Sequence, residues 1–172
     1  MSVLCDWEIR TLCGSGNAVS PFSMEFINPA SIDVRLGKNL MIETPHEPEL
    51  ELVDISEYSK ELPYLLHPGE FVLAETFEKF RIPDRISAQF VLKSSRAREG
   101  YQHLLAGWID PGYRGRLTLE IKNIRRYHAI PLYCGMRIGQ LVFHSMSQVP
   151  VRSYAETGHY LDHDRVMPSV AS

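Results

Sequence analysis

Apolar and polar residues alternate over several short stretches of this chain, the pattern of half-buried β-strands. The clearest is 117–121, where the apolar residues fall on one face and Glu120 falls on the other. The remaining predicted strands are 31–36, ending at Gly37, 71–75, 88–92, 130–133 and 140–143. Proline and glycine occur 11 times each and mostly separate these runs. The pattern predicts an all-β fold, a barrel or jelly roll of short strands.

Only the N-terminal region has helical periodicity. Apolar residues fall at Trp7, Ile9 and Leu12, and Asp6 is placed to cap the first turn. We expect a short helix over 5–13 that ends near Gly14 or Gly16.

Composition indicates one ordinary globular domain over residues 1–172. Hydrophobic residues make up 44% and charged residues 23%, and the net charge of -3 gives no general attraction to nucleic acid or to an anionic membrane. The acidic stretch 43–61 is expected to be a surface excursion, and 154–172 a polar tail that must pack on something or stay mobile.

The chain start has no signal-peptide pattern, and no apolar run is long enough to cross a bilayer. Cys5, Cys13 and Cys134 form an odd set without a C-x-x-C pair, which favours reduced thiols. Both observations predict a cytoplasmic protein.

Three segments concentrate groups that could perform chemistry. Lys93-Ser94-Ser95-Arg96-Ala97-Arg98 combines hydroxyls and cations that suit phosphate oxygens, or is simply an exposed basic turn. Asp110, before Pro111-Gly112, is either a turn residue or a carboxylate presented to a ligand. Glu120 faces water, or it lines a pocket where a carboxylate can serve as general acid and base.

Other chemistries have little support. The H-x-E and P-C-x-x-C signature of zinc nucleobase deaminases is absent, as are the Walker phosphate loop, G-x-G-x-x-G and H-E-x-x-H. His159 and His163 are four residues apart, but in a non-helical tail, so a metal site is the weaker interpretation.

Taken together, the segments resemble the dCTP deaminase family. The resemblance is carried by INPASIDVRLG (27–37), KSSRAR (93–98), AGWIDPGYRGRLTLE (106–120), GMRIGQLVF (135–143) and VMPS (166–169). It covers essentially the whole chain, and AGWIDPGYRG is also similar to a segment of trimeric dUTPases. The resemblance implies a distorted, dUTPase-like β-barrel of the β-clip type, assembled as a homotrimer with active sites at subunit interfaces. It also implies a deoxynucleoside triphosphate substrate whose phosphates carry Mg²⁺, with no zinc and no protein ligands to a metal.

The resemblance also assigns roles to individual residues. Glu120 matches the family's catalytic glutamate, Ser94 and Arg98 match residues that position water and the exocyclic group, and Asp110 matches the residue at the deoxyribose. In the dUTPase branch that carboxylate activates the water that attacks the α-phosphate. The substrate-binding positions implied by the resemblance are Lys93, Ser95, His103, Ala106, Thr118, Leu119, Gln140, Tyr154, His159, Tyr160 and His163.

Four functions remain open. The main prediction is hydrolytic deamination of dCTP to dUTP and ammonia, with Glu120 as proton shuttle. Because Gly107 and Trp108 resemble members that continue to dUMP and pyrophosphate, a bifunctional deaminase and diphosphatase is the close alternative. A dUTPase is less favoured because the tail lacks a glycine-rich arm, and a non-catalytic nucleotide-binding trimer is the alternative from another class.

Overall fold

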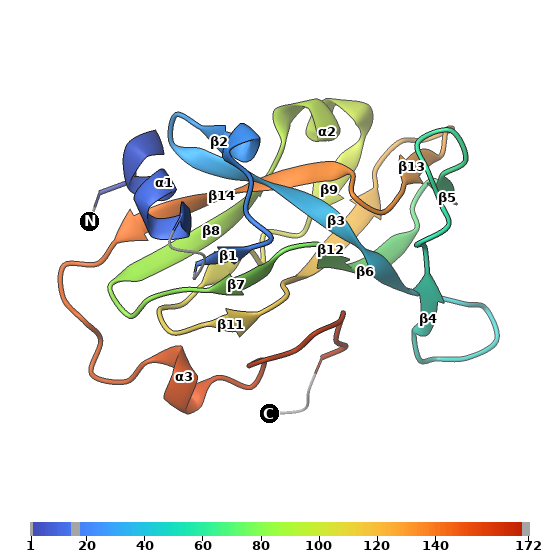
Figure 1. Cartoon of the computed structure of the whole chain (residues 1–172). Helices are drawn as coiled ribbons and strands as arrows, with labels where there is room; N and C mark the ends of the chain where they lie inside the picture. Colours follow the sequence, from blue (N-terminus) through green and yellow to red (C-terminus); the bar gives the residue numbers. More distant parts are fainter. Residues whose placement is uncertain (1, 15–17, 170–172) are drawn as a thin grey trace.

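The long strand β3 (Ser31–Ile42) organises the molecule, which is described here from a computed structural model covering residues 2–14 and 18–169. Its first half pairs with β2 (Ile27–Asn28) and β14 (Arg137–Ser145), and its second half pairs with β4 (Glu51–Asp54) and β6 (Phe71–Thr76). It therefore crosses the centre of the molecule from one half of the sheet to the other (Figure 1).

The prediction that β3 ends at Gly37 is wrong. The strand continues to Ile42, with a shift in its register against β6 between Leu36 and Leu40. A Cβ atom at residue 37 would collide with Glu75 Cγ and lie 2.9 Å from Glu75 Oε1. Gly37 therefore leaves room for the side chain of Glu75 close to the β3 backbone, and it does not end the strand.

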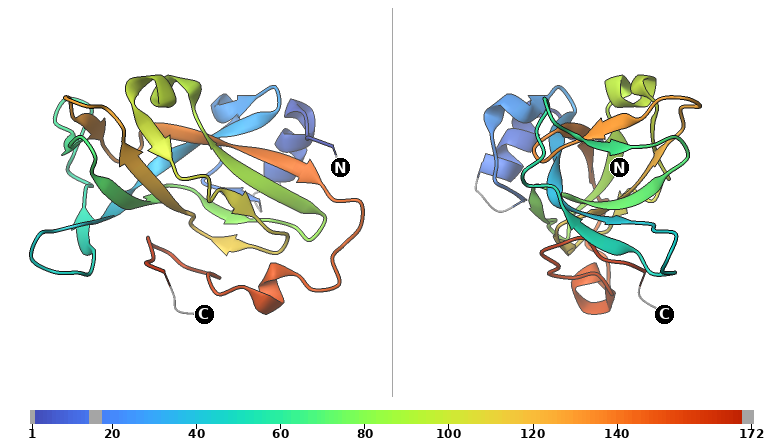
Figure 2. Two further views of the ribbon diagram at one scale, coloured as in Figure 1. Left: turned by 180° about the vertical axis from the view of Figure 1, so that it is seen from behind. Right: turned by 90° about the vertical axis from the view of Figure 1, so that its right-hand side faces the viewer.

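The main sheet has the strand order β10-β8-β14-β3-β6-β12-β9 and curls into an open barrel (Figure 2). Its remaining strands are β8 (Ile86–Leu92), β9 (Tyr101–His103), β10 (Trp108–Ile109) and β12 (Thr118–Asn123). Smaller sheets join β1 (Val19–Ser20), β7 (Lys79–Arg81) and β11 (Arg114–Gly115), and join β5 (Tyr64–Leu66) with β13 (Ile130–Leu132). The predicted all-β class is confirmed, and every predicted strand corresponds to an observed strand with somewhat different ends.

Short helices complete the chain: α1 (Asp6–Gly14), the 3₁₀ turn η1 (Met24–Phe26), α2 (Ser94–Glu99) and α3 (Tyr154–Thr157). The predicted N-terminal helix is confirmed and ends at Gly14, while Gly16 lies outside the described residues. Its cap differs from the prediction, because the Cys5 amide donates to Glu8 Oε2 at 2.9 Å whereas Asp6 is already helical. The sequence pattern did not predict α2 and α3, because helices of six and four residues are too short for a helical period to be recognised.

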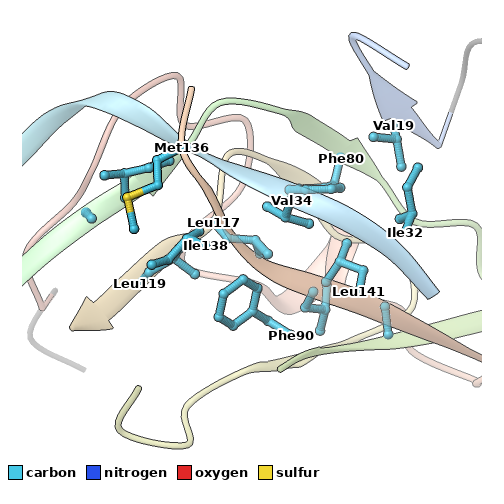
Figure 3. Packing of buried hydrophobic residues seen from close by; sticks show 14 of the residues in the cluster. Val19, Ile32, Val34, Phe80, Phe90, Leu117, Leu119, Met136, Ile138 and Leu141 are labelled. Atoms are coloured by element: carbon cyan, nitrogen blue, oxygen red, sulfur yellow. The ribbon is translucent and has the colours of Figure 1, made fainter. Parts of the chain in front are cut away.

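Buried side chains from both halves of the sheet form one core (Figure 3). Strand β12 contributes Leu119, with 1% of its surface exposed, and the fully buried Ile121. Burial of each such side chain contributes about 1.5–3 kcal/mol. With these residues fixed inward, the alternation of the strand turns Thr118 and Glu120 to its opposite face.

The polar tail packs on the barrel along β11 (Figure 1). The Asp162 amide donates to the Arg114 carbonyl at 2.8 Å, and the Arg116 amide donates to the His163 carbonyl at 2.9 Å. Val166 is the apolar residue that this segment buries, with 3% of its surface exposed. The segment 154–169, called the C-terminal segment below, is therefore part of the folded domain.

The acidic stretch 43–61 is mostly exposed, as expected, but it also contains β4, which the sequence pattern did not predict. Cys5, Cys13 and Cys134 are all free thiols, and burial raises the pKa of Cys13 to about 12. Within the described ranges, none of the helices has the length and apolar character required to span a membrane.

Candidate functional site

A cavity of about 600 Å³ lies between β10, β11, β12 and the C-terminal segment. Its lining residues are Leu50, Phe71, Leu73, Ala106, Trp108, Ile109, Asp110, Tyr113, Arg116, Leu117, Thr118, Glu120, Tyr154, Tyr160, His163, Met167, Pro168 and Ser169. The lining combines apolar and aromatic surface with two carboxylates, which is the composition of a small-molecule site.

Glu120 presents its carboxylate to this cavity from the middle of β12, opposite Leu73 of β6. Its side chain is 25% exposed, yet its buried Oε2 atom has no hydrogen-bond partner among the described residues. His103 Nε2, which is likewise buried and without a hydrogen bond there, lies 3.4 Å from that oxygen. His103 comes from the neighbouring strand β9 and packs edge-on against the Phe90 ring.

Asp110 stands at the start of the predicted turn, where Gly112 has the positive φ of 87° that glycine adopts readily. The Trp108 indole N–H donates to Asp110 Oδ1 at 3.0 Å, and the indole stacks on the His144 ring. Asp110 Oδ1 is thus held by Trp108, whose indole packs on His144 of β14.

Tyr113 forms part of the cavity wall, and its hydroxyl donates to the Arg116 carbonyl at 2.5 Å. Burial raises the pKa of Tyr113 and, more weakly, the pKa of Tyr154, whose rings lie 5.7 Å apart. Both phenols are therefore neutral hydroxyls at neutral pH.

The cavity brings together many of the residues singled out from the sequence. These are Ala106, Asp110, Thr118, Glu120, Tyr154, Tyr160 and His163, with His103 directly behind Glu120. Leu119 is adjacent in sequence, but its side chain lies in the core, and His159 is exposed outside the lining.

The basic segment does not reach this cavity. Ser94, Ser95 and Arg98 are exposed on α2, at the opposite side of the molecule from the C-terminal segment (Figures 1 and 2). Lys93, which precedes them, pairs with Asp33 at 2.6 Å.

A second polar cluster surrounds the nearly buried Asp33. The Asn28 amide donates to Asp33 Oδ1 at 2.9 Å, while the Ser31 hydroxyl donates to Gln140 Oε1 at 2.8 Å. The predicted positions Lys93 and Gln140 therefore belong to a group around Asp33 that is separate from the Glu120 cavity; its residues lie on β2, β3 and β14 and directly after β8.

The sequence interpretation missed several residues of the lining. Arg116 shares the period-two spacing of Thr118 and Glu120, so strand alternation could have identified it. Phe71, Leu73 and Met167 reach the cavity through strand pairing and tail docking, for which the sequence carries no local signal. In the part of the chain that is described, no three His, Cys, Asp or Glu side chains gather closely enough to hold a metal ion.

Fold and site together define an all-β protein whose curled sheet carries a carboxylate-bearing ligand cavity. Residues 3–146 match the dCTP deaminase-like family, and the chain belongs to that family. It is 42% identical over 149 residues to the dCTP deaminase, dUMP-forming, of Acidothermus cellulolyticus, covering 81% of this chain and 78% of that relative. It is 40% identical over 154 residues to the protein of the same name from Methanospirillum hungatei, covering 83% of this chain and 81% of the relative.

The fold comparison agrees. The 2′-deoxycytidine 5′-triphosphate deaminase of Agrobacterium tumefaciens superimposes with a TM-score of 0.67 at 25% identity, covering 83% of this chain. The matched region is 48% of that solved chain, so this chain spans about half its length. The dUTPase-like fold expected from the sequence motifs is thereby confirmed.

Proposed function

We propose that this protein is a bifunctional dCTP deaminase that converts dCTP and two water molecules into dUMP, ammonia and pyrophosphate. The observation that carries the proposal is that Glu120 and Asp110, the carboxylates for the two steps, line the same cavity. The names of the relatives, which are dUMP-forming enzymes, support this reaction over the main sequence prediction of dUTP as the final product.

In the deamination step, Glu120 accepts a proton from a water molecule whose oxygen adds to C4 of the cytosine. The carboxyl group passes this proton to N3, then takes the second proton from the new C4 hydroxyl and gives it to the amino group, so that C4=O forms, the C4–N bond breaks and ammonia leaves. The buried Oε2 atom suits this role, because the described residues leave it without a competing hydrogen bond. His103 Nε2 lies 3.4 Å from that atom, and this residue positions the carboxylate.

In the second step, Asp110 orients a water that attacks the α-phosphorus, and the bond to the β-phosphate oxygen breaks to release pyrophosphate. The Trp108 N–H fixes Oδ1, so the carboxylate has a defined orientation in the cavity. Mg²⁺ bound to the substrate phosphates would supply charge neutralisation for this step.

The remaining substrate contacts come from more than one copy of the chain. Ser94, Ser95 and Arg98 lie on α2, away from the Glu120 cavity of their own chain. In a homotrimer, α2 of one subunit supplies hydroxyls and a guanidinium to the cavity of the next. The family resemblance and the exposure of these groups in the single chain support this arrangement.

The test is to incubate the protein with Mg²⁺ and dCTP, and separately with dUTP, while measuring ammonia, pyrophosphate and the nucleotide products. The proposal expects dUMP from dCTP. Accumulation of dUTP would make the protein a deaminase only, and turnover of dUTP alone would make it a dUTPase. No turnover of either nucleotide would favour a non-catalytic nucleotide-binding protein.

A further inference from the structure

Glu75 is a buried carboxylate that neither reaction step uses. Only 2% of its surface is exposed, and no lysine or arginine in the described ranges forms an ion pair with it. Its Oε1 accepts a hydrogen bond from the side-chain amide of Asn39 at 3.0 Å. A buried charge without a counter-ion is costly unless several donors satisfy it. The hydrogen-bond donors around Glu75 therefore show which parts of the chain the carboxylate holds together.

The second partner of Glu75 comes from the C-terminal segment, 91 residues further along the chain. The Val166 amide donates to Glu75 Oε2 at 2.9 Å. The next amide, that of Met167, donates to the Thr118 hydroxyl oxygen at 3.2 Å. Glu75 and Thr118 are directly opposite each other in the pairing of β6 with β12. Two facing side chains therefore bind two successive amides of the C-terminal segment.

This pair of contacts, called the tail clamp below, lies beside the proposed catalytic carboxylate. Thr118 shares its face of β12 with Glu120, and Met167 follows the clamped Val166 directly. Met167, Pro168 and Ser169 form one wall of the cavity. The position of that wall therefore depends on where the tail clamp holds Val166.

The chemistry explains why a carboxylate stands at residue 75. Asn39 and Val166 both present N–H donors, so the side chain between them must offer an acceptor on each of its two oxygens. Glutamine would place its NH₂ group against one of these donors. Gly37 provides the space in which the side chain of Glu75 crosses β3.

We propose that Glu75 is a positioning residue, which with Thr118 holds the C-terminal wall of the nucleotide cavity in its binding position. The statement about nucleotide binding rests on the proposed function, whereas the statement about the C-terminal segment does not. One experiment with two measurements therefore separates them.

The first measurement is the rate of tryptic cleavage after Arg165, the exposed residue that precedes Val166, followed by mass spectrometry. Glu75→Gln is expected to speed this cleavage about tenfold, because a charged hydrogen bond to the segment is weakened. Cleavage after the exposed Arg152, in the same digests, is the internal reference and should not change. Thr118→Val, which keeps the shape of the side chain but removes the acceptor, should speed cleavage less. The matched control is Glu156→Gln, an exposed carboxylate on α3, which should have no effect.

The second measurement is steady-state turnover of dCTP. Glu75→Gln should raise KM about fivefold or more and leave kcat within about twofold, because the wall is displaced and the catalytic carboxylate is not. Equal acceleration at Arg165 and Arg152, or no acceleration at Arg165 in both clamp variants, would overturn the tail clamp. If wild-type protein does not turn over dCTP, the proposed function fails, and the digestion result still decides the role of Glu75.

Discussion

His103 Nε2 and Glu120 Oε2 lie 3.4 Å apart, and both atoms are buried without a hydrogen bond among the described residues. Two unsatisfied polar atoms that face each other at the edge of a cavity are costly in a resting fold. They are useful in a site where a carboxylate must exchange protons with a ligand while a neighbour keeps it in place.

Replacing His103 with phenylalanine should lower kcat for ammonia release by roughly tenfold to a hundredfold, because the carboxylate loses the polar neighbour that positions it while packing against Phe90 is retained. Initial rates of ammonia release at saturating dCTP would measure this. His46→Phe, at an exposed position, is the control and should behave like wild type. An undiminished rate in the His103 variant would remove this residue from the mechanism.

Glu120→Gln should abolish ammonia release from dCTP while nucleotide affinity stays within about tenfold, because the amide is nearly isosteric but cannot accept the proton. Coupled ammonia detection and isothermal calorimetry with dCTP would test the two parts of the prediction. Full activity would show that another group moves the protons.

Asp110→Asn should reduce pyrophosphate release more than ammonia release, because only the second step requires this carboxylate to orient the attacking water. The Trp108 N–H can still donate to the remaining oxygen of the asparagine, so the turn should keep its shape. Both products are measured from the same dCTP reaction. An unchanged rate of pyrophosphate release would reject the assigned role of Asp110.

Chelation separates a magnesium-dependent reaction from one that requires a tightly bound transition metal. EDTA in excess should stop pyrophosphate release, and added Mg²⁺ should restore it, because the ion is carried by the substrate phosphates. A chelator selective for zinc should have no effect at saturating Mg²⁺. Loss of activity with the zinc chelator would contradict the proposed metal requirement.

Gly115→Ala should loosen the C-terminal segment. Residue 115 has φ of 134°, and an added Cβ would lie 3.1 Å from both the backbone N and O of His163. We expect a loss of about 1–3 kcal/mol in the free energy of unfolding, together with faster tryptic cleavage after Arg165. Gly135→Ala is the matched control, because its φ is also positive but no atom lies within 4 Å of the added Cβ. It should show the backbone strain without the effect on the C-terminal segment.

Strand alternation predicted the fold well where one face of a strand is buried. Leu119 and Ile121 are in the core and Glu120 faces the cavity, as the period of two requires. The alternation pattern wrongly ended β3 at Gly37, because the reason for a glycine there is the side chain of Glu75, which comes from a strand distant in sequence. It also missed α2, whose few residues are ended by Gly100 in a left-handed conformation.

The candidate site was predictable to the extent that its residues are close in sequence. Asp110, Thr118 and Glu120 come from one continuous motif and line one cavity. Leu73 and Met167 enter through long-range pairing and docking, which a single sequence does not encode in any local pattern. Ser94 and Arg98 were predicted from the resemblance, and their place in a single chain is away from Glu120.

If one protein performs both steps, ammonia and pyrophosphate are released from dCTP together, and a time course of the two products measures this. With Mg²⁺ present, we expect equal amounts of the two products throughout the reaction, with dUMP as the nucleotide formed. Ammonia without pyrophosphate, accompanied by accumulating dUTP, would contradict it.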